Sequence, residues 1–151
     1  MKKTINDYLF VNIQLILFVL YLFPIRLFYI HSENILTILG AVIALLGGFV
    51  LLLALIQLNT NLSPYPSPKS SAILVKTGLY KFVRHPIYTG IILLFTGYAI
   101  YISSGFKGII SILVFVLFYL KSNYEEKRLQ NHYAEYAEYR KTTGRFFPKF
   151  F

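Results

Sequence analysis

The chain has 151 residues, 56% of them hydrophobic and only 14% charged, which is too apolar for a water-soluble domain of this size and indicates an integral membrane protein. Its 15 basic residues outnumber the 6 acidic ones, but they are spread along the chain, which argues against nucleic-acid binding. The sequence has no cysteine and its three histidines share no ligand-like spacing, so disulfides, thiolate sites and a bound metal are not expected.

Four apolar helices are predicted, at about residues 8–29, 35–58, 86–102 and 106–121. A membrane-spanning helix needs about 20 apolar residues, and the first two stretches meet this length. The third and fourth are shorter and are separated by the turn sequence "SSG", so we expect a tight helical hairpin. The first stretch is longer than a signal-peptide core and lacks a cleavage site, so we expect it to remain as a span. The predicted fold class is an all-α integral membrane protein with one domain over residues 1–151.

Basic residues are unevenly distributed among the predicted loops. They precede the first span and recur in the loop 59–85 and the tail 122–151, whereas the opposite side offers only Arg26 and Lys107. Loops rich in Lys and Arg face the cytoplasm. Both termini, the loop and the tail are therefore predicted to be cytoplasmic.

The two cytoplasmic segments are predicted to differ in structure. Pro64, Pro66 and Pro68 exclude a helix at the start of the loop, and non-helical backbone beside a membrane needs a polar cavity or a protein cover. The tail has no Pro or Gly between Ile109 and Thr143, so the last span is predicted to continue as a helix out of the membrane until the glycine that follows.

The sequence "YKFVRHPIYTG" places Arg84 and His85 at the start of the third apolar helix. In an antiparallel hairpin with a short turn, Glu125 and Glu126 of the fourth helix lie within one helical turn of their level. Pro86 suits the first helical turn, whose free amides favour an anion. Alone, the arginine fits a headgroup anchor and the glutamates fit a solvated helix face. Together they predict a polar site at the cytoplasmic mouth of the hairpin.

These stretches carry a family resemblance. The sequence "GLYKFVRHPIYTG", then an apolar hairpin, then "EEKRLQNHYAEYAEYRKTTGRFFP" resembles the superfamily of isoprenylcysteine carboxyl methyltransferases and phospholipid methyltransferases, in its small bacterial form. The stretch "NLSPYPSP" resembles the loop that precedes the first motif in bacterial members. The resemblance covers residues 59–148, and it implies a protein of the bacterial cytoplasmic membrane.

The resemblance implies that the methyl donor S-adenosylmethionine binds at the hairpin mouth and the C-terminal segment; the chain shows no Rossmann G-x-G-x-x-G loop. The implied donor-binding positions are Leu74, Val75, Tyr80, His85, Tyr88 and one or both of Glu125 and Glu126. The implied catalytic residues are Arg84, His85 and Glu125, and Lys121 is the nearest candidate for binding the acceptor substrate. These residue types suit a sulfonium donor, because aromatic faces tolerate its cation, a carboxylate pairs with its ammonium and cationic groups pair with its carboxylate.

Methyl transfer requires alignment and exclusion of water, and it needs no nucleophilic side chain. The predicted acceptor is an amphiphilic, membrane-associated molecule that is methylated on a carboxylate or an amine, with membrane lipids as the other partners. Two alternatives stay open. One is an NADPH-dependent membrane reductase of the sterol-reductase type, which shares an Arg-His-Pro-x-Tyr element, and the other is a small membrane protein without enzymatic activity.

Overall fold

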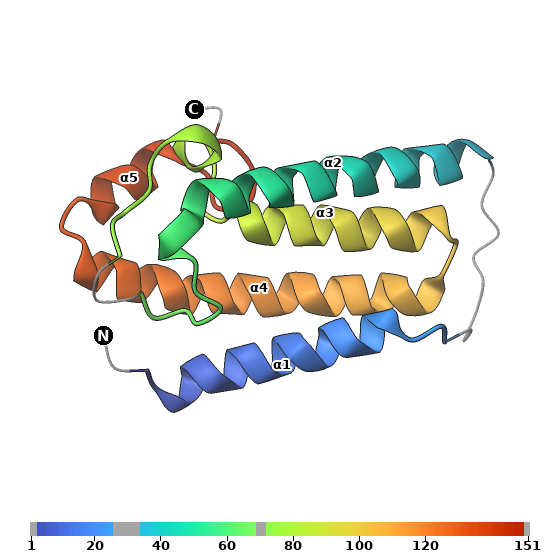
Figure 1. The fold of residues 1–151 in the computed structure, drawn as a ribbon, viewed down its shortest axis with the longest axis horizontal. Coiled ribbons are helices and arrows are strands. Elements are labelled where there is room, and N and C mark those ends of the chain that lie inside the picture. Colours follow the sequence, from blue (N-terminus) through green and yellow to red (C-terminus); the bar gives the residue numbers. More distant parts are fainter. Residues whose placement is uncertain (1–2, 26–33, 69–71, 150–151) are drawn as a thin grey trace.

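The computed structural model describes residues 3–25, 34–68 and 72–149. Within these ranges the chain forms five α-helices, which confirms the predicted all-α class (Figure 1). They are α1 (Ile5–Leu22), α2 (Asn34–Leu58), α3 (Pro86–Tyr101), α4 (Gly105–His132) and α5 (Tyr136–Thr142), with the short 3₁₀ helices η1 (Asn59–Asn61) and η2 (Gly78–Lys81) between α2 and α3.

The four long helices lie side by side in the spatial order α2, α3, α4, α1 (Figure 1). Small residues let α2 and α3 approach closely. A Cβ atom on Gly47 would lie 2.3 Å from the backbone nitrogen of Leu94, and one on Gly97 would lie 2.3 Å from that of Ala44. Such small-residue contacts are common between helices in membranes. The hairpin of α3 and α4 is thereby held between α2 and α1.

Three of the described helices, α1, α2 and α4, are long and apolar enough to cross a membrane. Helix α3 has 16 residues, which at 1.5 Å per residue makes it about 24 Å long. That is shorter than the roughly 30 Å of a bilayer's hydrocarbon core. The third apolar helix is therefore short, as the sequence predicts, and a tight turn joins it to α4.

Helix α1 ends earlier than the predicted span. It stops at Leu22, whereas the apolar stretch was expected to run to residue 29. Phe23 already has an extended backbone, because it precedes Pro24 and the ring of a proline disfavours helical angles in the residue before it. Residues 26–29 of the predicted span, including Arg26, lie outside the described residues.

The tail confirms one expectation and corrects another. Helix α4 continues to His132, well past the predicted span, but the chain then leaves the helix at Tyr133 and resumes it in α5. No proline or glycine causes this break. Tertiary contacts compete with the helix there, since the Tyr133 hydroxyl donates to the carbonyl of Ala72 at 2.7 Å and Glu135 pairs with Lys76. The tail is therefore fastened to the segment that follows the prolines.

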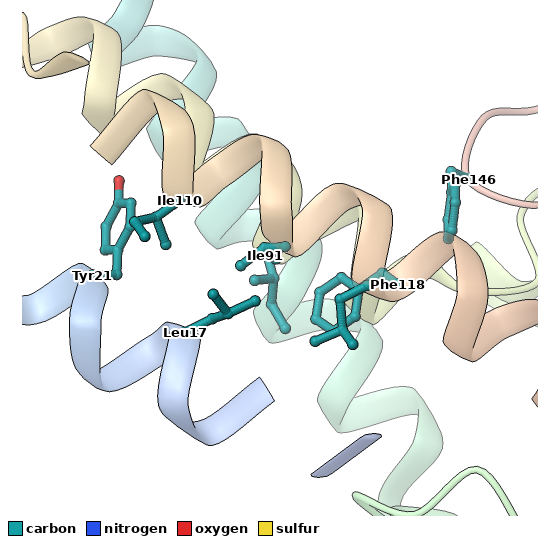
Figure 2. Close-up of a cluster of buried hydrophobic side chains, with 8 residues drawn as sticks. Leu17, Tyr21, Ile91, Ile110, Phe118 and Phe146 are labelled. Atoms are coloured by element: carbon teal, nitrogen blue, oxygen red, sulfur yellow. The ribbon is translucent and has the colours of Figure 1, made fainter. Parts of the chain in front are cut away.

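The apolar core lies where α1, α3 and α4 meet. Leu17 and Tyr21 of α1 face Ile91 of α3 and Ile110 of α4 (Figure 2). Further along α4, the core reaches Phe118 and, from the C-terminal segment, Phe146, and all these side chains are buried. Because Phe146 packs here, the end of the chain is fixed against the hairpin at the level of the predicted site.

Candidate active site

The segment before α3 is held by the C-terminal segment of the chain. Val83 and Gly144 form an isolated parallel bridge, in which the backbone amide of Arg84 donates to the Gly144 carbonyl at 2.9 Å and that of His85 donates to the Arg145 carbonyl at 3.1 Å. His85 is the N-cap of α3 and Pro86 occupies its first turn, as the sequence predicts. A Cβ on Gly144 would lie 1.6 Å from a neighbouring carbonyl oxygen, so only glycine fits the junction.

Glu126 is the centre of a buried ion-pair cluster. Its side chain is 3% exposed, and four groups face its carboxylate: Nε of Arg84 at 2.9 Å, Nε2 of His85 at 3.3 Å, Nε of Arg140 at 3.4 Å and Nε of Arg145 at 3.5 Å. A buried carboxylate is stable only when it is paired in this way. The cluster joins α4 to the segment before α3, to α5 and to the C-terminal segment, so it fixes the mouth of the hairpin.

Glu125 lies next to this cluster but has different partners. The Tyr88 hydroxyl donates to its Oε2 at 2.7 Å, and Nδ1 of His85 lies 3.8 Å from the same oxygen. The rings of His85 and Tyr88 are parallel, with centroids 5.2 Å apart, and Tyr88 also stacks on Phe118 at 4.4 Å. Glu125 is 23% exposed, so one carboxylate of the pair is enclosed by cations and the other is partly accessible.

A cavity of about 340 Å³ opens beside these residues. It lies between α1, α3, α4, α5 and the segments that connect α2 to α3. The predicted site residues that line it are Leu74, Val75, Tyr80, Arg84, His85, Tyr88, Lys121 and Glu125. Glu126 does not line the cavity. The structure thus brings together the whole predicted set, with Glu125 at the cavity wall and Glu126 behind it.

The family of this chain follows from comparison with known proteins. The family model described as "Phospholipid methyltransferase" matches residues 35–136, which contain α2, the hairpin and both glutamates. The chain belongs to this family. The resemblance seen in the sequence motifs is thereby confirmed.

Two known proteins are similar to this member of the phospholipid methyltransferase family over most of its length. The protein-S-isoprenylcysteine O-methyltransferase of Saccharomyces cerevisiae is 31% identical over 130 residues, which are 82% of this chain and 54% of the yeast protein. A solved structure of isoprenylcysteine carboxyl methyltransferase, a eukaryotic intramembrane Ras methyltransferase, has the same fold, with a TM-score of 0.70 at 18% identity over 98% of this chain and 54% of that one. The chain spans about half the length of each.

Lys121, the predicted acceptor-binding residue, is buried in the cavity wall. Its Nζ donates to Oε1 of Gln14 at 2.7 Å and to the carbonyl of Pro64 at 2.8 Å, and it lies 5.5 Å from the centre of the Tyr88 ring. These bonds use two of the three donors of an ammonium group. Lys121 therefore also fastens the proline-rich loop (residues 62–68), whose Pro64, Tyr65 and Pro66 line the cavity.

Two polar residues of α1, outside the family match, contact the site and escaped the sequence interpretation. Gln14 lines the cavity from α1, and its signal was a polar residue within an apolar span, a property that it shares with Asn12. Asp7 is fully buried and accepts hydrogen bonds from the backbone amide of Ser67 at 3.0 Å and from its hydroxyl at 2.8 Å. Its signal was the Thr4-x-x-Asp7 capping box at the start of α1. Through these two residues, α1 holds the proline-rich loop over the cavity.

Tyr80 and Tyr139, which line the cavity from outside the long helices, remain neutral phenols at physiological pH. Burial, opposed by the Arg84 guanidinium and supported by Glu126, raises the pKa of Tyr139 to about 12. Burial, reinforced by Glu125, also raises the pKa of Tyr80. The Tyr139 hydroxyl donates to the Tyr80 carbonyl at 2.5 Å, which ties α5 to η2. Both rings present neutral aromatic surface to the cavity, a surface that tolerates a cation.

Proposed function

We propose that this chain is a membrane methyltransferase that takes the methyl group from S-adenosylmethionine and transfers it to the polar end of a lipid-like acceptor. One observation carries the proposal: a cavity at the hairpin mouth that joins Glu125, Tyr88 and His85, in a chain of the phospholipid methyltransferase family. The yeast relative is named for O-methylation of isoprenylcysteine, which supports an acceptor with a hydrocarbon chain and a carboxylate.

The cavity fits the donor in size and chemistry. Its volume of about 340 Å³ lies within the range of roughly 300–1,000 Å³ that is usual for small-molecule sites. When bound, the donor supplies a methyl group activated by its sulfonium. Tyr80 and Tyr88 offer aromatic faces to such a cation, and Glu125 offers a carboxylate to an ammonium. Leu74 and Val75 add an apolar wall suited to a nucleobase.

The residues of the site align the reactants and exclude water, because an in-line methyl transfer requires no covalent intermediate. In this proposal Arg84 is a positioning residue, since its guanidinium donates to Glu126 at 2.9 Å and to the carbonyl of Thr143. His85, oriented by Glu126 and by the Tyr88 ring, and Glu125 itself are the proton acceptors when the methylated group is an amine.

The acceptor is proposed to lie on the Lys121 side of the cavity. Lys121 and Gln14 are polar groups on α4 and α1, two helices that are long and apolar enough to cross a membrane, so they suit the head of an amphiphile whose chain stays in the lipid. The third donor of the Lys121 ammonium then favours a carboxylate acceptor. The proline-rich loop and the C-terminal segment form the cover on the cytoplasmic side, and the chain acts in the bacterial cytoplasmic membrane with both termini cytoplasmic.

Transfer of labelled methyl groups tests the proposal. Detergent-purified protein is incubated with S-adenosylmethionine labelled on its methyl group and a lipid extract of the host, and the products are separated and identified by mass spectrometry. We expect label in a lipid-soluble product with the wild type and its loss with Glu125→Gln. Calorimetric titrations with S-adenosylhomocysteine and with NADPH separate the alternatives. Binding of NADPH alone would replace the proposal with a reductase, and binding of neither would leave a protein without this activity.

A further inference from the structure

The hydroxyl group of Tyr136 has no role in the function proposed above. Tyr136 begins α5, lines the cavity and is only 1% exposed. Its hydroxyl is buried and has no hydrogen-bond partner among the described residues. Burying a hydroxyl without a partner is unfavourable, so such a group in a native protein calls for a physical reason.

Neighbouring tyrosines show that the lack of a partner is specific to Tyr136. The Tyr133 hydroxyl donates to the carbonyl of Ala72 at 2.7 Å, and the Tyr139 hydroxyl donates to the carbonyl of Tyr80 at 2.5 Å. These two hydroxyls fasten the tail to the loop and to η2. Tyr136, which lies between them in sequence, fastens nothing through its hydroxyl. Its ring is buried and packs edge-on against the Tyr139 ring, with centroids 5.9 Å apart, whereas the hydrogen-bonding capacity of its hydroxyl is unused among the described residues.

The hydroxyl lies near charges of both signs. Tyr136 lies within electrostatic reach of Glu126, Arg84 and Glu125. The cluster at Glu126 holds three guanidinium groups against a single carboxylate, because Arg140 and Arg145 join Arg84 there. Of these guanidinium groups Arg84 lines the cavity, so a ligand carboxylate that accepts a hydrogen bond from Tyr136 has a cation nearby. Glu125, on the cavity wall, supplies the complementary site for an ammonium. A zwitterionic amino-acid group matches both.

We propose that the Tyr136 hydroxyl binds the amino-acid end of the methyl donor by donating a hydrogen bond to its carboxylate. The inference rests on the proposed function, since it names a contact of the donor in the same cavity. It assigns the donor's orientation as well. The amino-acid end lies at Tyr136 and Glu125, and the adenosine end lies toward Leu74 and Val75. Burial raises the pKa of the phenol, so the group keeps its proton and acts as a donor at physiological pH.

The substitution Tyr136→Phe tests this role, and Tyr139→Phe is the matched control. Both remove one hydroxyl from a buried ring of α5. For Tyr136→Phe we expect the melting temperature of the ligand-free protein to stay the same or to rise, because the lost hydroxyl had no partner. For Tyr139→Phe we expect it to fall, because the carbonyl of Tyr80 loses its donor.

Binding is measured by calorimetry with S-adenosylhomocysteine, and with 5′-methylthioadenosine by displacement of S-adenosylhomocysteine. The second ligand keeps the adenosine and the thioether but lacks the amino-acid end. We expect Tyr136→Phe to weaken binding of S-adenosylhomocysteine about 10- to 150-fold, the cost of one charge-assisted hydrogen bond. The affinity for 5′-methylthioadenosine should not change.

The outcomes separate the inference from the proposed function. If the wild type binds S-adenosylhomocysteine and Tyr136→Phe binds it equally well, the inference is wrong and the proposed function stands. If the variant loses affinity for both ligands by the same factor, the hydroxyl does not act on the amino-acid end and the inference is also wrong. A fall in the melting temperature of ligand-free Tyr136→Phe, with unchanged binding, would show a purely structural hydroxyl. A wild type that binds neither ligand overturns the proposed function and the inference together.

Discussion

Substitution of each of the two adjacent glutamates by glutamine should affect a different property: stability for Glu126 and ligand binding for Glu125. Glu126→Gln removes the charge that neutralises Arg84, and both side chains are almost fully buried, at 3% and 7% exposed. Breaking a buried ion pair by removing one partner costs about 3–5 kcal/mol. The contribution of Arg140 is discounted, because its side chain is 50% exposed and solvent screens the pair. Glutamine keeps one acceptor oxygen, so we expect the lower end, about 3 kcal/mol.

A loss of this size is readily measured. For a chain of this length, 1 kcal/mol corresponds to about 2–4 °C in melting temperature, so Glu126→Gln should melt roughly 6–12 °C below the wild type in detergent, followed by circular dichroism. The exposed ion pair of Lys76 and Glu135 supplies the control, because Glu135→Gln should cost about 0–1 kcal/mol.

Glu125→Gln should instead affect ligand binding. The glutamine still accepts the hydrogen bond from Tyr88, so the melting temperature should change little, whereas the affinity for S-adenosylhomocysteine should fall about 10- to 150-fold. The reasoning would be refuted if Glu126→Gln melted with the wild type while Glu125→Gln unfolded, because the structure assigns the ion-pair cluster to Glu126 alone.

Four further predictions concern the segments around the cavity. Lys121→Gln removes the ammonium, so the KM for a carboxylate acceptor should rise about 10-fold or more with donor affinity unchanged; an unaltered KM would remove Lys121 from the acceptor site. Asp7→Asn weakens charge-assisted hydrogen bonds worth about 1.5–3 kcal/mol each, so limited proteolysis should cut the proline-rich loop faster, and an equal cleavage rate would contradict its anchoring role. Truncation before Lys141 should abolish donor binding while insertion is retained; binding at full affinity would leave the tail as a surface helix only. Reporter fusions after Phe151 and within His31–Asn34 should lie on opposite sides of the membrane, and a common side would exclude the four-span topology.

The proximity of Arg84 and His85 to the Glu125-Glu126 pair was predictable, because a helical hairpin has a regular geometry. A short turn and a fixed rise per residue place the start of one helix beside a known part of the other. The side-chain contacts reach further than this level. Glu125 was expected near Arg84 and His85, and it also accepts a hydrogen bond from Tyr88, about one turn further along α3. Side chains of a helix lean toward its N-terminus, so Glu125 covers the surface about one turn before its own Cα. Backbone register alone therefore misplaces side-chain contacts.

Features that depend on contacts between distant segments were not predictable in the same way. The break after α4 occurs at Tyr133 without proline or glycine, because contacts with the segment near Ala72 override a local preference for helix. Asp7 is separated by 60 residues from Ser67, and Gln14 is separated by 107 residues from Lys121, the residues to which they are hydrogen-bonded. Nothing in the local sequence of α1 indicates these partners, since each bond depends on how α1 packs against α4.

The cavity at the hairpin mouth is proposed to hold the methyl donor. Ultraviolet crosslinking of the purified protein with radiolabelled S-adenosylmethionine, followed by mass spectrometry of the labelled peptides, tests this most directly. We expect label on the cavity residues around Tyr88 and Tyr136, and we expect this label to disappear when excess S-adenosylhomocysteine competes. Label confined to peptides that do not line the cavity, or label that the competitor does not displace, would contradict it.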